Sequence, residues 1–115
     1  MVGELRDDTH PIDAVMSGFP AGTVSGAPKV RAMQIIDELE NEARGVYGGA
    51  IGYFSADGNV DTCIALRTGI VKDDRLYVQA GAGIVADSKS QMENAECENK
   101  AKALFSAARN ALFGD

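Results

Sequence analysis

Two carboxylates and an amine stand about one helical turn apart near the C-terminal end of the sequence. Glu93, Glu96 and Lys100 are three and four residues apart. On a helix, residues with this spacing share one face. Two carboxylates on one face could hold a hard divalent cation such as Mg²⁺, which takes oxygen ligands and keeps several water molecules. The alternative is that Glu96 and Lys100 form only a surface ion pair, because their i, i+4 order favours one.

The segment Gly81-Ala82-Gly83 precedes these charged residues. Glycine lets a ligand approach the backbone closely, because it carries no side chain. The segment and the carboxylates could therefore bind an anionic substrate and a metal ion together. A helix from Ser88 to about Leu112 would position the carboxylates at the border of its apolar stripe. That stripe has i, i+3, i+4, i+7 spacing and consists of Ala101, Leu104, Phe105 and Ala108.

The composition indicates one globular unit. The chain has 115 residues, 45% of them hydrophobic, and a net charge of -6. This length allows one modest hydrophobic core. The negative charge argues against nucleic acid or an anionic membrane surface as the main partner, since both require a basic footprint.

The two cysteines and the single histidine do not form a recognisable metal motif. Cys63 and Cys97 are far apart, and their spacing with His10 matches no zinc site. The sequence also has no signal peptide and no apolar run of about 18 residues. Together with the distant cysteines, this indicates a protein of the reducing cytoplasm. We expect Cys97 to pack on the apolar face of its helix and His10 to lie at the surface.

The periodicity of the sequence predicts an α+β fold in a single partial domain over residues 1–115. Two helices come first, from Pro11 to about Gly18 and from Pro28 to about Glu40, with a loop between them. An antiparallel β-meander and the long C-terminal helix follow. The expected strands are Gly49 to Phe54, Val60 to Val71 and Leu76 to Val85, with turns at Ala56-Asp57-Gly58-Asn59 and Lys72-Asp73-Asp74. Such a meander has two unpaired edges, which predicts a fragment of a larger sheet and its self-association.

Five blocks of the sequence resemble, in order, those of the chorismate-utilising enzymes, and specifically the anthranilate synthase component I family. The first block reads FPAGTVSGAPKVRAM. The resemblance covers nearly the whole chain, but only about the C-terminal quarter of a family member. It implies a fragment of the larger chorismate-binding α/β sandwich. The blocks are Phe19 to Met33, Arg44 to Tyr53, Asp61 to Thr68, Gln79 to Val85 and Glu93 to Ala101.

The resemblance implies a role for each charged residue of the last helix. Glu93 and Glu96 match the glutamates that bind Mg²⁺ in the family, and Glu96 is the better candidate for direct coordination. Lys100 matches a lysine one turn later, which implies a catalytic position. A cation there can balance the carboxylates or meet the substrate.

The resemblance also implies a binding site for a carboxylate of the substrate. Arg67 matches the arginine that grips this carboxylate, a role that suits a planar donor of two parallel hydrogen bonds. Tyr47 matches the tyrosine that assists it. Gly81 and Gly83 match positions where backbone N–H groups approach the same carboxylate, and a side chain would block that approach.

Two further pairs of residues have alternative interpretations. Thr23 and Ser25 lie just ahead of the second helix, where free N–H groups and the helix dipole favour a bound anion. Ser25 could equally be only a helix cap. Tyr53 and Cys63 could line the tryptophan feedback pocket of the family, but both are equally natural core residues.

The sequence departs from the family pattern at two places. Ser88-Lys89-Ser90 lacks the proline that usually opens the last helix, which weakens the helix start. Met1 to Leu5 resembles the end of the block H-x-V-S-x-V-x-G-x-L, after its histidine. We therefore expect the chain alone to lack the catalytic histidine, which His10 does not replace, and the upstream part of the substrate pocket.

The function implied by the resemblance is the Mg²⁺-assisted amination of chorismate, with pyruvate elimination, to give anthranilate for tryptophan biosynthesis. A glutamine amidotransferase subunit, component II, would supply the ammonia. One alternative is a sister enzyme on the same scaffold, such as aminodeoxychorismate or isochorismate/salicylate synthase. Another is a non-catalytic fragment that binds at most a partner half-domain. We expect the 115 residues to be inactive alone.

Overall fold

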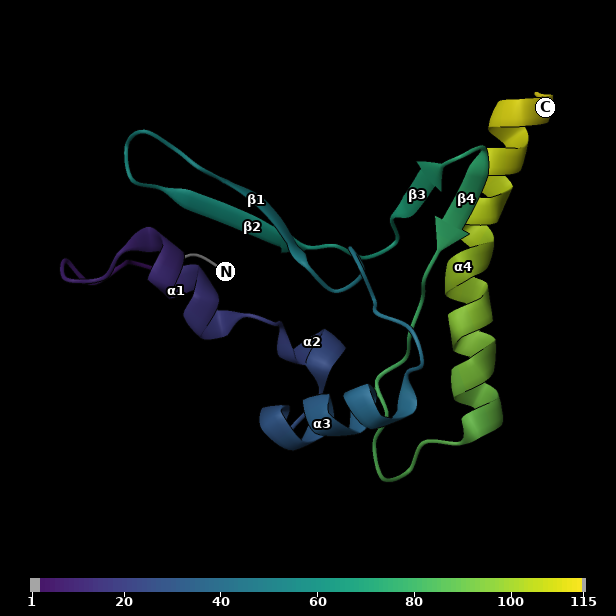
Figure 1. The fold of residues 1–115 in the computed structure, drawn as a ribbon, viewed down its shortest axis with the longest axis horizontal. Coiled ribbons are helices and arrows are strands. Elements are labelled where there is room, and N and C mark those ends of the chain that lie inside the picture. The colour runs from purple at the N-terminus through teal and green to yellow at the C-terminus, as the bar shows by residue number, and fades with distance from the viewer. Residues whose placement is uncertain (1–2, 115) are drawn as a thin grey trace.

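The computed structural model describes residues 3–114, so Met1 and Val2 of the N-terminal block lie outside the described residues. The observed order of elements confirms the predicted α+β class (Figure 1). A long helix ends this order, as the sequence predicted. The elements are α1 (Pro11–Gly18), α2 (Gly22–Ser25), α3 (Lys29–Leu39), β1 (Ala50–Phe54), β2 (Val60–Ile64), β3 (Gly69–Lys72), β4 (Arg75–Val78) and α4 (Ser90–Phe113).

The helices begin and end close to their predicted limits. His10 is exposed, as expected, and it also caps α1, because its Nδ1 accepts a hydrogen bond of 3.3 Å from the amide of Ile12. The prediction of a loop before α3 was wrong in part, because this segment contains the short helix α2. Gly26 ends α2 with a φ of 89° and a ψ of -179°, a conformation that is open almost only to glycine. None of the described helices combines the length and apolar character needed to cross a membrane.

The strands form two antiparallel hairpins, which corrects the predicted continuous meander. β1 pairs with β2, and β3 pairs with β4, but β2 and β3 belong to separate sheets. The predicted strand from Val60 to Val71 is interrupted because Arg67 has a φ of 53°, which a strand cannot contain. The strand predicted to reach Val85 ends at Val78.

The two predicted turns are present. In the first, the amide of Ser55 donates a hydrogen bond of 2.9 Å to the carbonyl of Asn59, and Gly58 has a positive φ of 86°. In the second, Asp73 and Asp74 have φ values of 52° and 58°. Two consecutive positive φ values are typical of a type I′ turn, which suits the right-handed twist of a tight hairpin.

The described residues do not form the modest core that we expected from the composition. Among residues 3–114, only Ser25, Gly48 and Ala65 are buried. The radius of gyration is 17.2 Å, against about 13 Å for a compact domain of about 100 residues. Figure 1 shows the reason: α4 and the β3–β4 hairpin lie at one end of the molecule, and α1 and the β1–β2 hairpin lie at the other. Large apolar side chains are therefore left without partners.

We expect the isolated chain to self-associate. Several large apolar residues are highly exposed, and each hairpin has free edges that can pair with another strand. In sedimentation velocity, the average sedimentation coefficient should rise with protein concentration. A monomer at every concentration would contradict this expectation. The most exposed of these large apolar residues, between 73% and 80%, are Val30, Leu39, Val71, Ile84, Leu112 and Phe113.

Candidate functional site

A cavity of about 210 Å³ lies where α2, the open end of the β1–β2 hairpin, the Gly81-Ala82-Gly83 segment and α4 meet. Apolar walls are provided by Val24, Leu66 and Leu104. Polar and glycine residues singled out from the sequence converge on the same space, although they are far apart along the chain. These residues are Thr23, Tyr47, Arg67, Gly81, Gly83 and Lys100.

The backbone ladder of the first hairpin explains why Tyr47 and Arg67 meet. Beyond the ends of β1 and β2, the amide of Gly48 donates to the carbonyl of Ala65 at 2.9 Å, and the amide of Ala65 donates to the carbonyl of Gly49 at 2.8 Å. Tyr47 directly precedes this extension, and Arg67 follows it by two residues. The extended pairing therefore delivers both side chains to the cavity. Arg67 is exposed there.

Lys100 connects α4 to the glycine segment. Its Nζ donates a hydrogen bond of 2.9 Å to the carbonyl oxygen of Gly81. The same atom lies 2.5 Å from the Oε1 of Glu96. The hydrogen bond that Lys100 donates to the Glu96 carboxylate raises the pKa of Lys100 above its ordinary value. The ion pair that we weighed as an alternative is therefore formed, and its lysine is part of the cavity wall.

The inward face of α4 is turned slightly from the face that the sequence predicted. Glu93, Lys100 and Leu104 are partly buried on it. Phe105, which we placed in the apolar stripe, is 52% exposed, and the side chain of Glu96 is 53% exposed. Cys97 is partly buried, in agreement with a packing role. Glu93 thus lies on the inward face, and Glu96 lies at its solvent-exposed border.

The donor set suits a hard cation only in part. Among residues 3–114, no group of three or more His, Cys, Asp and Glu side chains is arranged to hold a metal ion. Glu93 and Glu96 offer carboxylate oxygens from a single helix face. Mg²⁺ typically binds through one or two carboxylates, water and substrate oxygens, so this chemistry fits Mg²⁺ with its remaining ligands from elsewhere.

Ser25 does not line the cavity that contains Thr23. It is 4% exposed, and its hydroxyl donates a hydrogen bond of 3.1 Å to the carbonyl of Ala21. The interpretation of Ser25 as a cap of the next helix is wrong, because Pro28 occupies the N-cap of α3. Ser25 instead satisfies its hydroxyl within α2.

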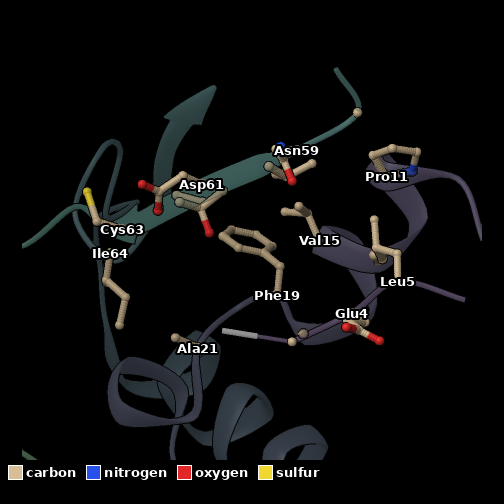
Figure 2. A pocket seen from close by; sticks show the side chains of 18 of the residues that line it. Glu4, Leu5, Pro11, Val15, Phe19, Ala21, Asn59, Asp61, Cys63 and Ile64 are labelled. Carbon is tan, nitrogen blue, oxygen red and sulfur yellow. The ribbon is translucent and has the colours of Figure 1, made fainter. Parts of the chain in front are cut away.

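A wider groove of about 1020 Å³ lies between α1, the N-terminal segment and β2. Figure 2 shows Val15 and Phe19 pointing into it from α1 and its end, with Cys63 at its edge. Tyr53 is not among its lining residues and is 60% exposed. Cys63 is also exposed. The interpretation of both as core residues is wrong, because no described segment packs over them.

The sequence interpretation missed two residues near the cavity. Gln79 lines it, and period-two spacing with Gly81 and Gly83 would have indicated a shared side of the extended segment. Arg44 lies behind Tyr47 with its guanidinium 5.7 Å from the centre of the ring. The i, i+4 spacing of Glu40 and Arg44 would have indicated an ion pair in the sequence.

Comparison with known proteins identifies relatives of the whole segment. Residues 1–106 match the sequence profile of the chorismate binding enzyme family. The chain is 64% identical over 111 residues to anthranilate synthase component 1 of Bacillus caldotenax, covering 96% of this chain and 22% of that protein. With the component 1 of Acetivibrio thermocellus it shares 64% identity over 109 residues, which are 95% of this chain and 22% of that protein.

A solved structure shows the same arrangement of elements. The crystal structure of anthranilate synthase component I from Streptococcus pneumoniae TIGR4 matches with a TM-score of 0.82 and 60% sequence identity. That match covers 87% of this chain and 23% of the other. The chain thus spans about 22% of the length of its curated relatives. Because the family profile covers almost all of its residues, the chain belongs to the chorismate binding enzyme family.

Proposed function

We propose that this chain forms the substrate-binding segment of an anthranilate synthase component 1, which aminates chorismate and eliminates pyruvate to give anthranilate. The observation that carries the proposal is the convergence of Tyr47, Arg67 and the two glycines on one cavity beside α4. The identity to component 1 proteins favours this product over those of sister chorismate enzymes. We further propose that residues 1–115 are one partial domain.

Arg67 and its neighbours would bind the carboxylate of the enolpyruvyl group. The guanidinium can donate two parallel hydrogen bonds to a carboxylate, and the Tyr47 hydroxyl can add a third. The amides of Gly81 and Gly83 lie in the same wall, where a ligand can approach the backbone. Thr23 closes the cavity from α2. Such contacts fix the orientation of the substrate before reaction.

Glu93 and Glu96 would hold a Mg²⁺ ion, which when bound would hold the ring carboxylate of chorismate and neutralise its charge. Lys100 already balances the charge of Glu96 and fixes the carbonyl of Gly81. This lysine therefore keeps the glycine segment in register with α4. The substrate would be held at both ends, by the carboxylate site at one end and by the Mg²⁺ ion bound to α4 at the other.

The remaining parts of the proposal concern partners and place. A glutamine amidotransferase, component II, would deliver the ammonia that replaces the departing hydroxyl group. We place the protein in the cytoplasm, because its thiols at Cys63 and Cys97 are free. A tryptophan feedback pocket remains a proposal for Cys63, which lies at the edge of the wide groove, and for Tyr53 on the neighbouring strand.

The proposal can be tested in a full-length component 1 relative whose matching segment is replaced by this chain, which we term the segment-replaced enzyme. With chorismate, Mg²⁺ and ammonium, it should form anthranilate, detected by fluorescence. The unaltered relative is the positive control. Failure to form anthranilate, with correct folding shown by circular dichroism, would contradict the proposed function. Formation of a different product would favour a sister enzyme.

Two glycine substitutions distinguish packing within the cavity wall from the approach of the ligand to that wall. A Cβ at Gly81 would lie 2.9 Å from the Tyr47 hydroxyl, whereas a Cβ at Gly83 would meet no atom within 4 Å. Gly81→Ala in the segment-replaced enzyme should therefore displace Tyr47 and lower both thermal stability and chorismate affinity. Gly83→Ala should lower affinity alone, because its methyl group would obstruct only the ligand.

Thermal unfolding and chorismate titration of both variants measure these effects. A normal affinity for Gly83→Ala would show that the substrate does not approach this amide. Equal loss of stability in the two variants would contradict the distinction between wall and ligand.

A further inference from the structure

The side chain of Arg44 contacts three different residues. Its Nε and Nη2 donate hydrogen bonds of 2.8 and 2.5 Å to the two carboxylate oxygens of Glu40. Its Nη1 donates a bond of 2.7 Å to the carbonyl of Val24. Its guanidinium also lies over the ring of Tyr47, 5.7 Å from the centroid. The side chain of Arg44 is only 26% exposed.

These contacts join the end of α3 to two parts of the cavity wall. Val24 and Tyr47 both line the cavity, and Thr23 precedes Val24. Tyr47 in turn has its hydroxyl against Gly81, whose carbonyl accepts from Lys100. A continuous set of contacts therefore runs from Glu40 through Arg44 and Tyr47 to Gly81 and α4.

We propose that Arg44 is a positioning residue that holds the Tyr47 ring and the Val24 backbone in place for the substrate carboxylate. The inference rests on the proposed function, and it assigns a residue outside the cavity to the affinity of the site. Arg44 does not line the cavity itself. Its effect on a ligand must therefore act through Tyr47 and α2.

The geometry requires an arginine at this position. A planar guanidinium has five N–H donors in a fixed fork, so it can bind both oxygens of Glu40 and the Val24 carbonyl while it stacks on a ring. A lysine would keep the charge but presents a single ammonium, which cannot make these contacts together. The ion pair is mutually reinforcing: the hydrogen bonds from Arg44 lower the pKa of Glu40, and those with Glu40 raise the pKa of Arg44.

The expected kinetic effect falls on KM and not on kcat. The substrate carboxylate does not react, so the contacts that Tyr47 makes with it are equally strong in the ground state and the transition state. Loss of such uniform binding raises KM and leaves kcat unchanged. We expect Arg44→Lys in the segment-replaced enzyme to raise the KM for chorismate about tenfold, the scale of one hydrogen bond in this site.

Arg31 provides a matched control. It also pairs with a glutamate, at 3.2 Å from Glu38, but both side chains are about 60% exposed and neither lines the cavity. Arg31→Lys should leave KM and kcat unchanged. A second test combines Arg44→Lys with Tyr47→Phe. Because Arg44 acts in part through Tyr47, the rise in KM of the double variant should be smaller than the product of the two single-variant rises, since coupled residues are not additive.

The outcomes separate this inference from the proposed function. An unchanged KM for Arg44→Lys, a tenfold fall of kcat in its place, or additive effects with Tyr47→Phe would overturn the positioning role. If the unsubstituted segment-replaced enzyme formed no anthranilate, the proposed function alone would fail. Chorismate binding by the same variants, measured by equilibrium dialysis, would then decide the role of Arg44, with the same tenfold weakening expected for Arg44→Lys and none for Arg31→Lys.

Discussion

The isolated 115-residue chain is expected to form no anthranilate from chorismate, Mg²⁺ and ammonium. Arg67 is exposed, and the Glu96 side chain is 53% exposed, so a substrate held there would stay in contact with water. Electrostatic stabilisation weakens several-fold in such surroundings, because the effective dielectric constant is high. The two carboxylates of α4 also lack a third protein ligand among the described residues.

Fluorescence detection of anthranilate measures this directly, with the segment-replaced enzyme under identical conditions as the positive control. The isolated chain should give no signal above that of buffer even at a high protein concentration. Turnover that scales with the concentration of the isolated chain would contradict the prediction. It would mean that residues 1–115, as monomers or in a self-associated form, complete the site without further polypeptide.

The helices could be predicted from the sequence because their signals are local. Pro11 and the apolar spacing in α3 and α4 set the limits of these helices to within about two residues. The two hairpin turns were equally local, since Gly58 and the two aspartates Asp73 and Asp74 favour positive φ. These elements follow from interactions within a few residues, which any surrounding fold would preserve.

The break between the two hairpins could not be predicted in the same way. Residues 60–71 alternate well enough for one long strand, and arginine has no preference for a left-handed conformation. Arg67 nevertheless adopts a φ of 53°. This conformation costs of order 1 kcal/mol or more and persists only where surrounding structure compensates. It turns the chain out of the first hairpin, so that Arg67 reaches the cavity while β3 starts a separate hairpin.

Packing was the least predictable property. A hydrophobic content of 45% indicates that a core is possible, but it does not indicate whether the apolar faces meet each other. Here Leu112 and Phe113 are about 80% exposed. The helices are amphipathic, as expected. However, the surfaces that would cover their apolar faces are not among the described residues. Composition alone therefore overestimated the self-sufficiency of the chain.

The candidate site was predicted from motifs, whereas its geometry required the structure. The family resemblance indicated Tyr47, Arg67 and Lys100 individually. Only the fold shows that the extended ladder at Gly48 and Ala65 brings Tyr47 and Arg67 together, and that Lys100 binds the Gly81 carbonyl. The same applies to Arg44, whose contacts connect residues 20 positions apart along the chain.

Glu96→Gln and Arg67→Lys in the segment-replaced enzyme are expected to lower activity through different steps. Glutamine keeps the shape of Glu96 but removes a charged ligand, so both Mg²⁺ affinity and turnover should fall. Lysine keeps the charge of Arg67 but loses the bidentate fork. We expect this to cost about 2 kcal/mol or more of transition-state stabilisation, which corresponds to about a thirtyfold lower kcat/KM.

A Mg²⁺ titration of steady-state rates distinguishes the two defects. Raising Mg²⁺ should partly rescue Glu96→Gln, because mass action compensates for weaker binding, but it should leave Arg67→Lys unchanged. Glu98→Gln is the matched control, since Glu98 is an exposed carboxylate of the same helix that pairs with Asn94 at 3.0 Å; its Mg²⁺ dependence should be that of the unsubstituted enzyme. Equal rescue of Glu96→Gln and Arg67→Lys, or rescue of neither, would mean that the metal role of Glu96 in α4 and the carboxylate-binding role of Arg67 between β2 and β3 are wrongly assigned.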